Sequence, residues 1–299
     1  MSSRPTTAPN EGAPPKMDVS PTGVAVAAGE ALECLASNLA RVRARIDRAA
    51  AASGRAPGSV RLLAVTKYTT AEGVAALMEL GLRDFGENYV QAALVKQEET
   101  AIQHALRRRL ANAEGADPVA ESAPARWHLI GPLQTNKARL IPGRFASVRT
   151  IDRVKVSDAL ARFVGDAGLR LAVQIQVNTT LEATKSGVSL EGVRALARAV
   201  EATGVLDLDG LMTIGPTDGT PAAAAEAFRT LDRAAQDLEH ELGRPMARSM
   251  GMSHDLEAAV AAGATEVRIG SALFEGLPEL RADDARATPA EPASDGASR

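Results

Sequence analysis

From about residue 60 to residue 270, short apolar runs alternate with longer segments whose apolar residues recur every three or four positions. The run from Leu62 to Val65 is typical of a buried strand, and 70–81 has the spacing of an amphipathic helix that ends at Gly81. This strand-then-helix pattern occurs eight times in succession. Strands are predicted at 60–66, 84–88, 127–131, 147–152, 169–178, 208–214, 247–252 and 266–270. Helices are predicted at 70–81, 89–113, 133–141, 154–168, 189–204, 221–243 and 254–263, and a last helix is expected to begin over 271–276.

The alternation also predicts how the strands are arranged. Consecutive strands that are joined through helices run parallel, because a parallel connection needs a crossover. Eight such units in about 220 residues fit a closed (β/α)8 barrel, the TIM barrel, better than an open sheet. An open doubly wound sheet remains the alternative. It usually carries a glycine-rich dinucleotide turn after its first strand, and the segment TKYTTAEG at that place contains no GxGxxG.

Segments outside the alternation divide the chain. Residues 31–54 form a predicted amphipathic helix, an extra element before the barrel. Residues 1–27, which are rich in Pro, Ser and Thr, and residues 280–299, which are similar, are predicted to be disordered tails. A single barrel domain is therefore expected at 28–279, with a small acidic insertion at 114–125 and no second, β-rich domain.

Charge and cysteine content argue against several classes of protein. The net charge is −3 and the arginines are spread along the chain, which does not suggest a nucleic-acid binder. Cys34 is the single cysteine, so the chain can form no internal disulfide, and the expected location is the reducing cytoplasm. No apolar run reaches the ~18 residues of a membrane-spanning helix, and the N-terminus lacks the apolar stretch of a signal peptide.

Candidate chemistry lies at the predicted strand ends, because the site of a (β/α)8 barrel is built at the carboxyl ends of its strands. Lys67 follows the first strand, although a single lysine considered alone is more often a solvated strand end. Gly251 to Ser253 and Gly270–Ser271 each place glycine and serine where a helix is expected to start. Such turns bind anions through free backbone N–H groups, so a phosphate site is one interpretation and simple N-capping by serine is the other.

A lysine that faces a phosphate site has a specific chemical implication. Partial desolvation lowers the pKa of an amine and frees it to attack a carbonyl. A ligand with a phosphate and an aldehyde fits this description, and pyridoxal 5′-phosphate (PLP) is such a ligand. Arg268 alternates with Val267 and Ile269 and is expected to point inward, where it would face the pyridine nitrogen or form a salt bridge with Glu266 or Glu87. A different phosphorylated carbonyl, held by an aldolase-like lysine, stays open as an alternative.

Several long motifs resemble one family. They are LLAVTK, FGENYVQ, WHLIGPLQTNKARLI, QVNTTLEATKSGV, GLMTI and SMGMSHDLEAAVAAGATEVRIGSALF, and together they extend from about residue 31 to residue 277. The chain is similar in these motifs to the PLP homeostasis protein family. This resemblance implies an alanine-racemase-like barrel of the fold-type III PLP-binding class.

The resemblance also implies roles for individual residues. The lysine that forms the Schiff base with PLP falls on Lys67, and the residue that faces the ring nitrogen falls on Arg268. The phosphate-binding residues fall on Ser253 and on Gly270–Ser271, while Asn88 and Met252 are expected to line the cofactor. Ser271 replaces the commoner threonine and keeps the hydroxyl group, and ALFEG departs from the more usual AIFG ending.

The function implied by the resemblance is storage, buffering or delivery of PLP, with apo PLP-dependent enzymes as recipients, no turnover of its own, and a monomeric or weakly dimeric state. The alternative is a fold-type III enzyme such as an amino-acid racemase. Alanine racemases carry a second domain that supplies an opposing tyrosine, and no such domain is expected here. Lys137 and Lys185 are predicted near the barrel mouth, either as anion-attracting groups or as solvated ends, and His128 is expected to be a hydrogen-bonded core residue.

Overall fold

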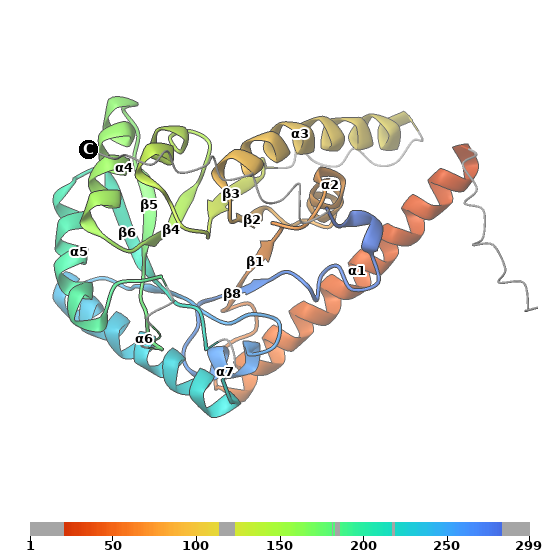
Figure 1. Ribbon diagram of the computed structural model, residues 1–299. Helices are drawn as coiled ribbons and strands as arrows, with labels where there is room; N and C mark the ends of the chain where they lie inside the picture. Colours follow the sequence, from red (N-terminus) through yellow and green to blue (C-terminus); the bar gives the residue numbers. More distant parts are fainter. Residues whose placement is uncertain (1–20, 114–122, 181, 183–185, 217–218, 283–299) are drawn as a thin grey trace, which may run out of the picture.

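The computed structural model describes residues 21–113, 123–180, 182, 186–216 and 219–282. Eight parallel strands form one closed barrel in chain order, and the helices surround it (Figure 1). The strands are β1 (Arg61–Val65), β2 (Asp84–Glu87), β3 (Arg126–Leu129), β4 (Ser147–Ile151), β5 (Leu171–Gln176), β6 (Leu206–Met212), β7 (Ala247–Ser249) and β8 (Glu266–Ile269). The predicted barrel and its eight strands are therefore confirmed, and the open doubly wound alternative is wrong.

The helices follow the predicted pattern with two exceptions. They are α1 (Pro21–Ala52), α2 (Ala71–Glu79), α3 (Val90–Ala113), α4 (Val154–Asp166), α5 (Val193–Ala202), α6 (Pro221–Leu242) and α7 (Leu256–Ala261), with 3-10 helices η1 (Thr135–Leu140), η2 (Leu190–Gly192) and η3 (Pro278–Leu280). The helix expected at 133–141 is the 3-10 helix η1. The helix expected to begin over 271–276 does not form, because that segment makes successive turns before η3.

Both chain ends differ from the expected boundaries. Helix α1 begins at Pro21, so the tail boundary predicted at residue 27 falls inside this helix. At the other end, Leu280 is buried and Arg281 pairs with Thr69, so the chain packs on the barrel beyond residue 279. Residues 1–20 and 283–299, the remainder of the predicted tails, lie outside the described residues, as do residues 114–122 of the predicted insertion.

The closure of the barrel sets the register at the candidate site. Strand β8 pairs with β1, so that Leu63 lies opposite Arg268 and Ala64 lies opposite Ile269. Continuing this register brings Val65 beside Gly270, and a Cβ on Gly270 would lie 3.3 Å from the Cβ of Val65. Lys67 and Ser271 therefore leave the sheet at the same rim.

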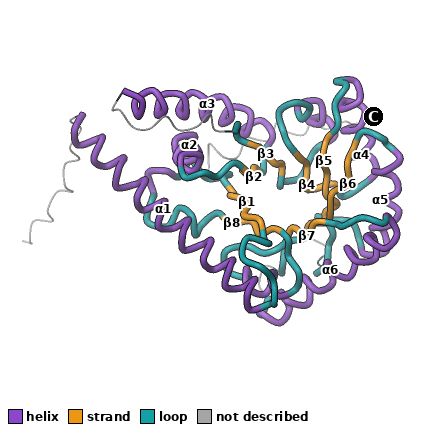
Figure 2. Tube along the Cα trace, turned by 180° about the vertical axis from the view of Figure 1, so that it is seen from behind, coloured by secondary structure: helices purple, strands orange, loops and turns teal. Residues whose placement is uncertain are grey.

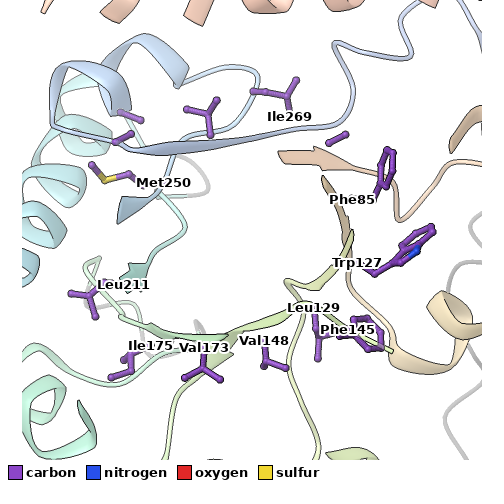
Figure 3. Packing of buried hydrophobic residues seen from close by; sticks show 14 of the residues in the cluster. Phe85, Trp127, Leu129, Phe145, Val148, Val173, Ile175, Leu211, Met250 and Ile269 are labelled. Carbon is purple, nitrogen blue, oxygen red and sulfur yellow. The ribbon is translucent and has the colours of Figure 1, made fainter. Parts of the chain in front are cut away.

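The main hydrophobic layer lies between the strands and the helices. Figure 3 shows Val148, Val173 and Ile175 projecting from the strands toward this layer, and all three are fully buried. Phe85 and Trp127 pack against each other there, with ring centroids 5.5 Å apart. The opposite face of the strands lines the barrel interior, where buried polar residues such as Arg149, Glu266 and Arg268 lie.

Helix α1 lies outside the barrel, where it runs past β8 (Figure 2) and packs against α7. Its inward face is the set of buried residues Leu35, Leu39, Val42 and Ile46, which recur at helical spacing. Among the described helices, none combines the length and apolar character needed to cross a membrane.

Replacing Ile46, which is 4% exposed in α1, with alanine is expected to lower the free energy of unfolding by about 2–5 kcal/mol, because the change leaves a cavity. The matched change Ile102→Ala, at a side chain that is 60% exposed, is expected to cost about 0.5 kcal/mol or less. Urea unfolding measures both. Equal costs would contradict the packing of α1 against the barrel.

Candidate functional site

A cavity of about 310 Å³ lies at the carboxyl ends of β1, β7 and β8. Its walls come from three strand ends: the segment after β1, the turn after β7 and the turn after β8. The lining residues are Val65, Lys67, Tyr68, Thr69, Met252, Ser253, His254, Arg268, Gly270, Ser271, Phe274 and Arg281. Six of the sequence-predicted site residues lie in this lining, so the barrel brings them together; they are Lys67, Met252, Ser253, Arg268, Gly270 and Ser271.

The backbone before Lys67 is held by a buried polar cluster. The Thr66 hydroxyl donates to Glu87 Oε1 at 2.7 Å, and Lys96 of α3 donates to the same oxygen at 2.9 Å and to the Thr66 carbonyl at 2.7 Å. Thr66 points outward to the helix layer, so Lys67, the next residue, points to the barrel mouth. The Lys67 Nζ lies 4.8 Å from the ring centroid of Tyr68. Glu87 is therefore part of the support for Lys67 and does not pair with Arg268.

The two serine-bearing turns meet. The Ser271 hydroxyl donates to the Ser253 hydroxyl at 3.2 Å. Gly251 permits the first turn, because its φ of +94° favours glycine and a Cβ would lie 2.5 Å from the Cβ of Ala259. Hydroxyl groups at this spacing can both bind oxygens of one anion.

Neither serine is an N-cap, so the capping interpretation of these turns is wrong. Helix α7 begins at Leu256 with Asp255 as its N-cap, and Ser253 lies in the turn before it. Ser271 begins a turn in which the Phe274 N–H donates to its carbonyl at 3.2 Å. Anion binding at these turns therefore rests on the hydroxyl groups and local N–H groups, and the contribution expected from two helix starts is absent.

Arg268 lies inside the barrel directly below the cavity. It is 5% exposed, and it donates to the Ser249 hydroxyl at 2.9 Å and to the Thr213 carbonyl at 2.7 Å. Burial lowers the pKa of its guanidinium to about 10, so the group stays charged at neutral pH. The direct salt bridge to Glu266 or Glu87, one of the two expectations for Arg268, is not among its contacts.

Glu266 supports Arg268 from one layer deeper. Its carboxylate accepts from the Ser249 hydroxyl at 2.8 Å and forms an ion pair with Arg149, both of them buried. Burial alone would raise the pKa of Glu266, but the charge of Arg149 outweighs it and holds this pKa below the usual value. Glu266 thus pairs directly with Arg149 and reaches Arg268 through Ser249, while Asp209 near Arg149 and Asp255 near Arg268 add further carboxylates to this layer.

His128 continues the same interior layer. Its Nδ1 lies 2.8 Å from the Ser147 hydroxyl and its Nε2 lies 2.8 Å from Asp84 Oδ1. Burial lowers the pKa of His128, although Asp84 opposes this shift. The prediction of a hydrogen-bonded core histidine is confirmed.

Asn88 lies at a neighbouring cavity and not among the residues around Lys67. This second cavity, of about 280 Å³, is lined by Asn88, Ile130, Gly131, Pro132, Gln176, Val177, Asn178, Ser186 and Ile214. Gly131 is needed at its edge, because a Cβ there would overlap the backbone of Asn88. Lys137 lines neither cavity, and Lys185 lies outside the described residues.

Six residues of the lining were not among the predicted site residues, namely Val65, Tyr68, Thr69, His254, Phe274 and Arg281. Arg281 was assigned to a tail. The apolar pair Leu277 and Leu280 was a signal that the chain packs here, since both side chains are buried. In the described part of the chain, no group of His, Cys, Asp and Glu residues is suited to hold a metal ion.

Comparison with known proteins yields consistent matches. Residues 37–278 match the family described as alanine racemase, N-terminal domain. The chain is 44% identical over 244 residues to the pyridoxal phosphate homeostasis protein of Pseudomonas aeruginosa, covering 81% of this chain and 96% of that protein. It is 38% identical over 240 residues to the protein of the same name from Escherichia coli strain K12, covering 80% and 95%. Among solved structures, PipY of Synechococcus elongatus PCC7942 with PLP bound matches with a TM-score of 0.65 and 29% identity, covering 80% of this chain and 99% of PipY.

Glu266→Gln is expected to lower the free energy of unfolding by about 3–5 kcal/mol, because Arg149 and Arg268 then lack their buried counter-charge. The control is Glu275→Gln, which removes the exposed ion pair of Glu275 with Arg41 and is expected to cost about 1 kcal/mol or less. Urea unfolding at neutral pH measures both, and similar losses would contradict the balancing role of Glu266.

The same residue predicts a pH dependence. Because the pKa of Glu266 is lower in the folded than in the unfolded state, its contribution is complete above the usual pKa of 4.5 and is lost as the pH falls below it. Between pH 5 and pH 3, the Glu266→Gln variant is therefore expected to lose less unfolding free energy than the wild type. A parallel decrease in both proteins would contradict the assignment.

Proposed function

The chain belongs to the pyridoxal phosphate homeostasis protein family, within the wider family of alanine racemase N-terminal domains, and from this membership we propose that it binds PLP in the cavity beside Lys67. One observation carries the proposal. An amine, a pair of hydroxyl groups 3.2 Å apart and a buried guanidinium group surround a single cavity of about 310 Å³. The volume lies in the usual range for small-molecule sites, about 300–1,000 Å³.

The phosphate end of PLP is assigned to the two converging turns. The hydroxyl groups of Ser253 and Ser271 donate to phosphate oxygens, and Gly270 lets the ligand approach the backbone at the end of β8. Met252 lies in the same lining and contacts the ligand. Its N–H donates to Asp255 Oδ1 at 2.5 Å, which orders the turn that carries Ser253.

The opposite end of PLP is assigned to Lys67. Its amine condenses with the aldehyde of PLP, one water molecule leaves, and the Schiff base holds the ligand covalently. The buried cluster of Thr66, Glu87 and Lys96 fixes the backbone from which Lys67 extends. Asn88, which lies at the neighbouring cavity, remains a predicted contact of the ligand's outer edge.

Arg268 is assigned to the pyridine nitrogen. This contact makes the site better suited to binding PLP than to catalysis with PLP as a cofactor. Bound PLP supplies an electron sink for carbanion chemistry, and this sink is strongest when the ring nitrogen is protonated. A guanidinium group that is locked in place by Ser249 and the Thr213 carbonyl disfavours that protonation. We therefore propose storage, buffering or delivery of PLP without turnover, with apo PLP-dependent enzymes as recipients. The single cysteine is compatible with a cytoplasmic setting.

A racemase of a small amino acid is the second candidate. Tyr68 favours it, because a second acid–base group lines the same cavity as Lys67. Tyr68 is adjacent to Lys67 in sequence, whereas racemisation needs the two groups on opposite faces of the substrate carbon. Racemisation assays with alanine and serine separate the two functions. Turnover in those assays would show that the protein is a racemase and would reject the carrier function.

Lys67→Ala is expected to abolish the absorbance band that appears at longer wavelength than that of free PLP when PLP is added to the wild type, because no amine remains to form the Schiff base. Lys155→Ala removes an exposed lysine of α4 and is expected to leave the band unchanged. Spectrophotometric titration measures both variants. A full band in Lys67→Ala would place the attachment on another lysine.

Ser271→Ala is expected to weaken PLP binding by about tenfold, because the phosphate loses a charge-assisted hydrogen bond. Ser271→Thr keeps the hydroxyl and is expected to bind within about twofold of the wild type. Equilibrium dialysis gives both dissociation constants. Equal weakening in the two variants would assign the effect to packing, and the phosphate would then bind elsewhere.

A PLP-loaded sample mixed with an apo-enzyme tests delivery. The carrier function predicts that the apo-enzyme regains activity faster than PLP dissociates from the loaded protein alone. If the two rates are the same, the protein is a passive buffer and direct delivery is excluded.

A further inference from the structure

The last described residues form a short segment that lies against the loop carrying Lys67. We call residues 277–282 the C-terminal strap. The Thr70 N–H donates to the Leu280 carbonyl at 2.9 Å, and the Ala282 N–H donates to the Tyr68 carbonyl at 2.9 Å. Thr69 and Arg281 pair as an antiparallel bridge between these two bonds. The strap therefore adds a strand-like partner to the residues directly after Lys67.

Side-chain packing anchors the strap on the barrel. Leu277 and Leu280 are 3% and 4% exposed. Gly73 of α2 leaves room for Leu280, because a Cβ at this glycine would lie 3.3 Å from the Leu280 Cβ and 2.7 Å from Thr69 Cγ2. Leu280 of the strap therefore packs closely against α2 at Gly73.

The segment before the strap is held from the other side by α1. Asn38, which is buried, donates to the Leu273 carbonyl at 3.0 Å and to the Glu275 carbonyl at 2.9 Å. The segment leading into the strap is thus tied to α1, and the strap itself is tied to the loop after β1. This arrangement fixes the backbone position of Arg281 relative to Lys67.

The Arg281 side chain lines the Lys67 cavity. It also lines an adjoining cavity of about 510 Å³, and Ser271 and Phe274 are common to both. Arg281 therefore lies on the same side of the site as the pair of serine hydroxyls. Within the described part of the chain, its guanidinium group has no hydrogen bond or ion pair.

The other cationic side chains of the lining have assigned partners. The lining contains three lysine or arginine residues: Lys67, Arg268 and Arg281. Lys67 is assigned to the aldehyde end, and Arg268 is held by Ser249 and the Thr213 carbonyl. A phosphate between Ser253 and Ser271 would otherwise meet neutral hydroxyl groups, whereas a guanidinium group matches phosphate in charge and geometry.

We propose that Arg281 binds the phosphate of PLP and that the C-terminal strap, by holding Arg281 there, makes PLP retention depend on the docked strap. This inference rests on the proposed PLP-binding function and adds a phosphate contact outside the two serine-bearing turns after β7 and β8. Detachment of the strap would remove this contact and weaken the grip on the phosphate while Lys67 and both serines stay in place.

Dissociation constants for PLP and for pyridoxal, which lacks the phosphate, test the role of Arg281. Titrations followed by absorbance use the full-length wild type, Arg281→Ala and Arg281→Lys. The control is Arg139→Ala, because Arg139 is exposed in η1, lies in neither cavity and carries the same charge. Arg281→Ala is expected to weaken PLP binding by about tenfold, the loss of one charge-assisted hydrogen bond, and to leave pyridoxal binding within about twofold. Arg281→Lys is expected to recover part of the loss.

The outcomes separate this inference from the function on which it rests. If the wild type fails to bind PLP, the proposed function is wrong. If the wild type binds PLP and Arg281→Ala behaves like Arg139→Ala, only the role of Arg281 is overturned. A loss that is equal for PLP and pyridoxal also overturns it, since the effect would then come from the strap's packing and not from the phosphate.

Discussion

The pairing of β8 with β1 is the constraint on which the site depends. This pairing closes the barrel and places Leu63 opposite Arg268, so that Lys67 and the turn at Ser271 leave the sheet at one rim. The turn after β7 lies at the same rim, because the Ser271 hydroxyl donates to the hydroxyl of Ser253 in that turn. Residues that are about two hundred positions apart in the sequence thereby line a single cavity, without any loop having to reach across the barrel.

Electrostatic balance inside the barrel is the second requirement. Arg149 and Arg268 are both buried, and each would be costly without a counter-charge. Glu266 pairs with Arg149 and reaches Arg268 through Ser249, so that it links both groups in one network. The guanidinium group below the cavity is therefore rigid and charged. The proposal that the protein holds PLP and does not use it as an electron sink rests on this property. The charged groups in the barrel interior are therefore linked by hydrogen bonds to Arg268, which lines the cavity at the barrel mouth.

Periodicity predicted the barrel because each strand and helix buries its own regular face, and the strand ends then located Lys67, Ser253 and Ser271. It could not predict that Arg268 binds the Ser249 hydroxyl and the Thr213 carbonyl, since these groups come from other strand segments that meet β8 only in the folded barrel. The segment 271–276 was expected to be helical from its apolar residues, but it forms turns whose Leu273 and Glu275 carbonyls accept from Asn38 of α1. Arg281 was missed because its position follows from docking of the strap, for which the apolar pair Leu277 and Leu280 was the local signal.

Mapping the covalent attachment of PLP tests the central claim most directly. The protein is incubated with PLP, treated with borohydride to reduce the Schiff base to a stable amine, digested, and analysed by mass spectrometry. The account predicts that the pyridoxyl label is found on the peptide containing Lys67 and at stoichiometric yield. A label that is spread over surface lysines, or concentrated on another residue such as Lys96 or Lys137, would contradict it.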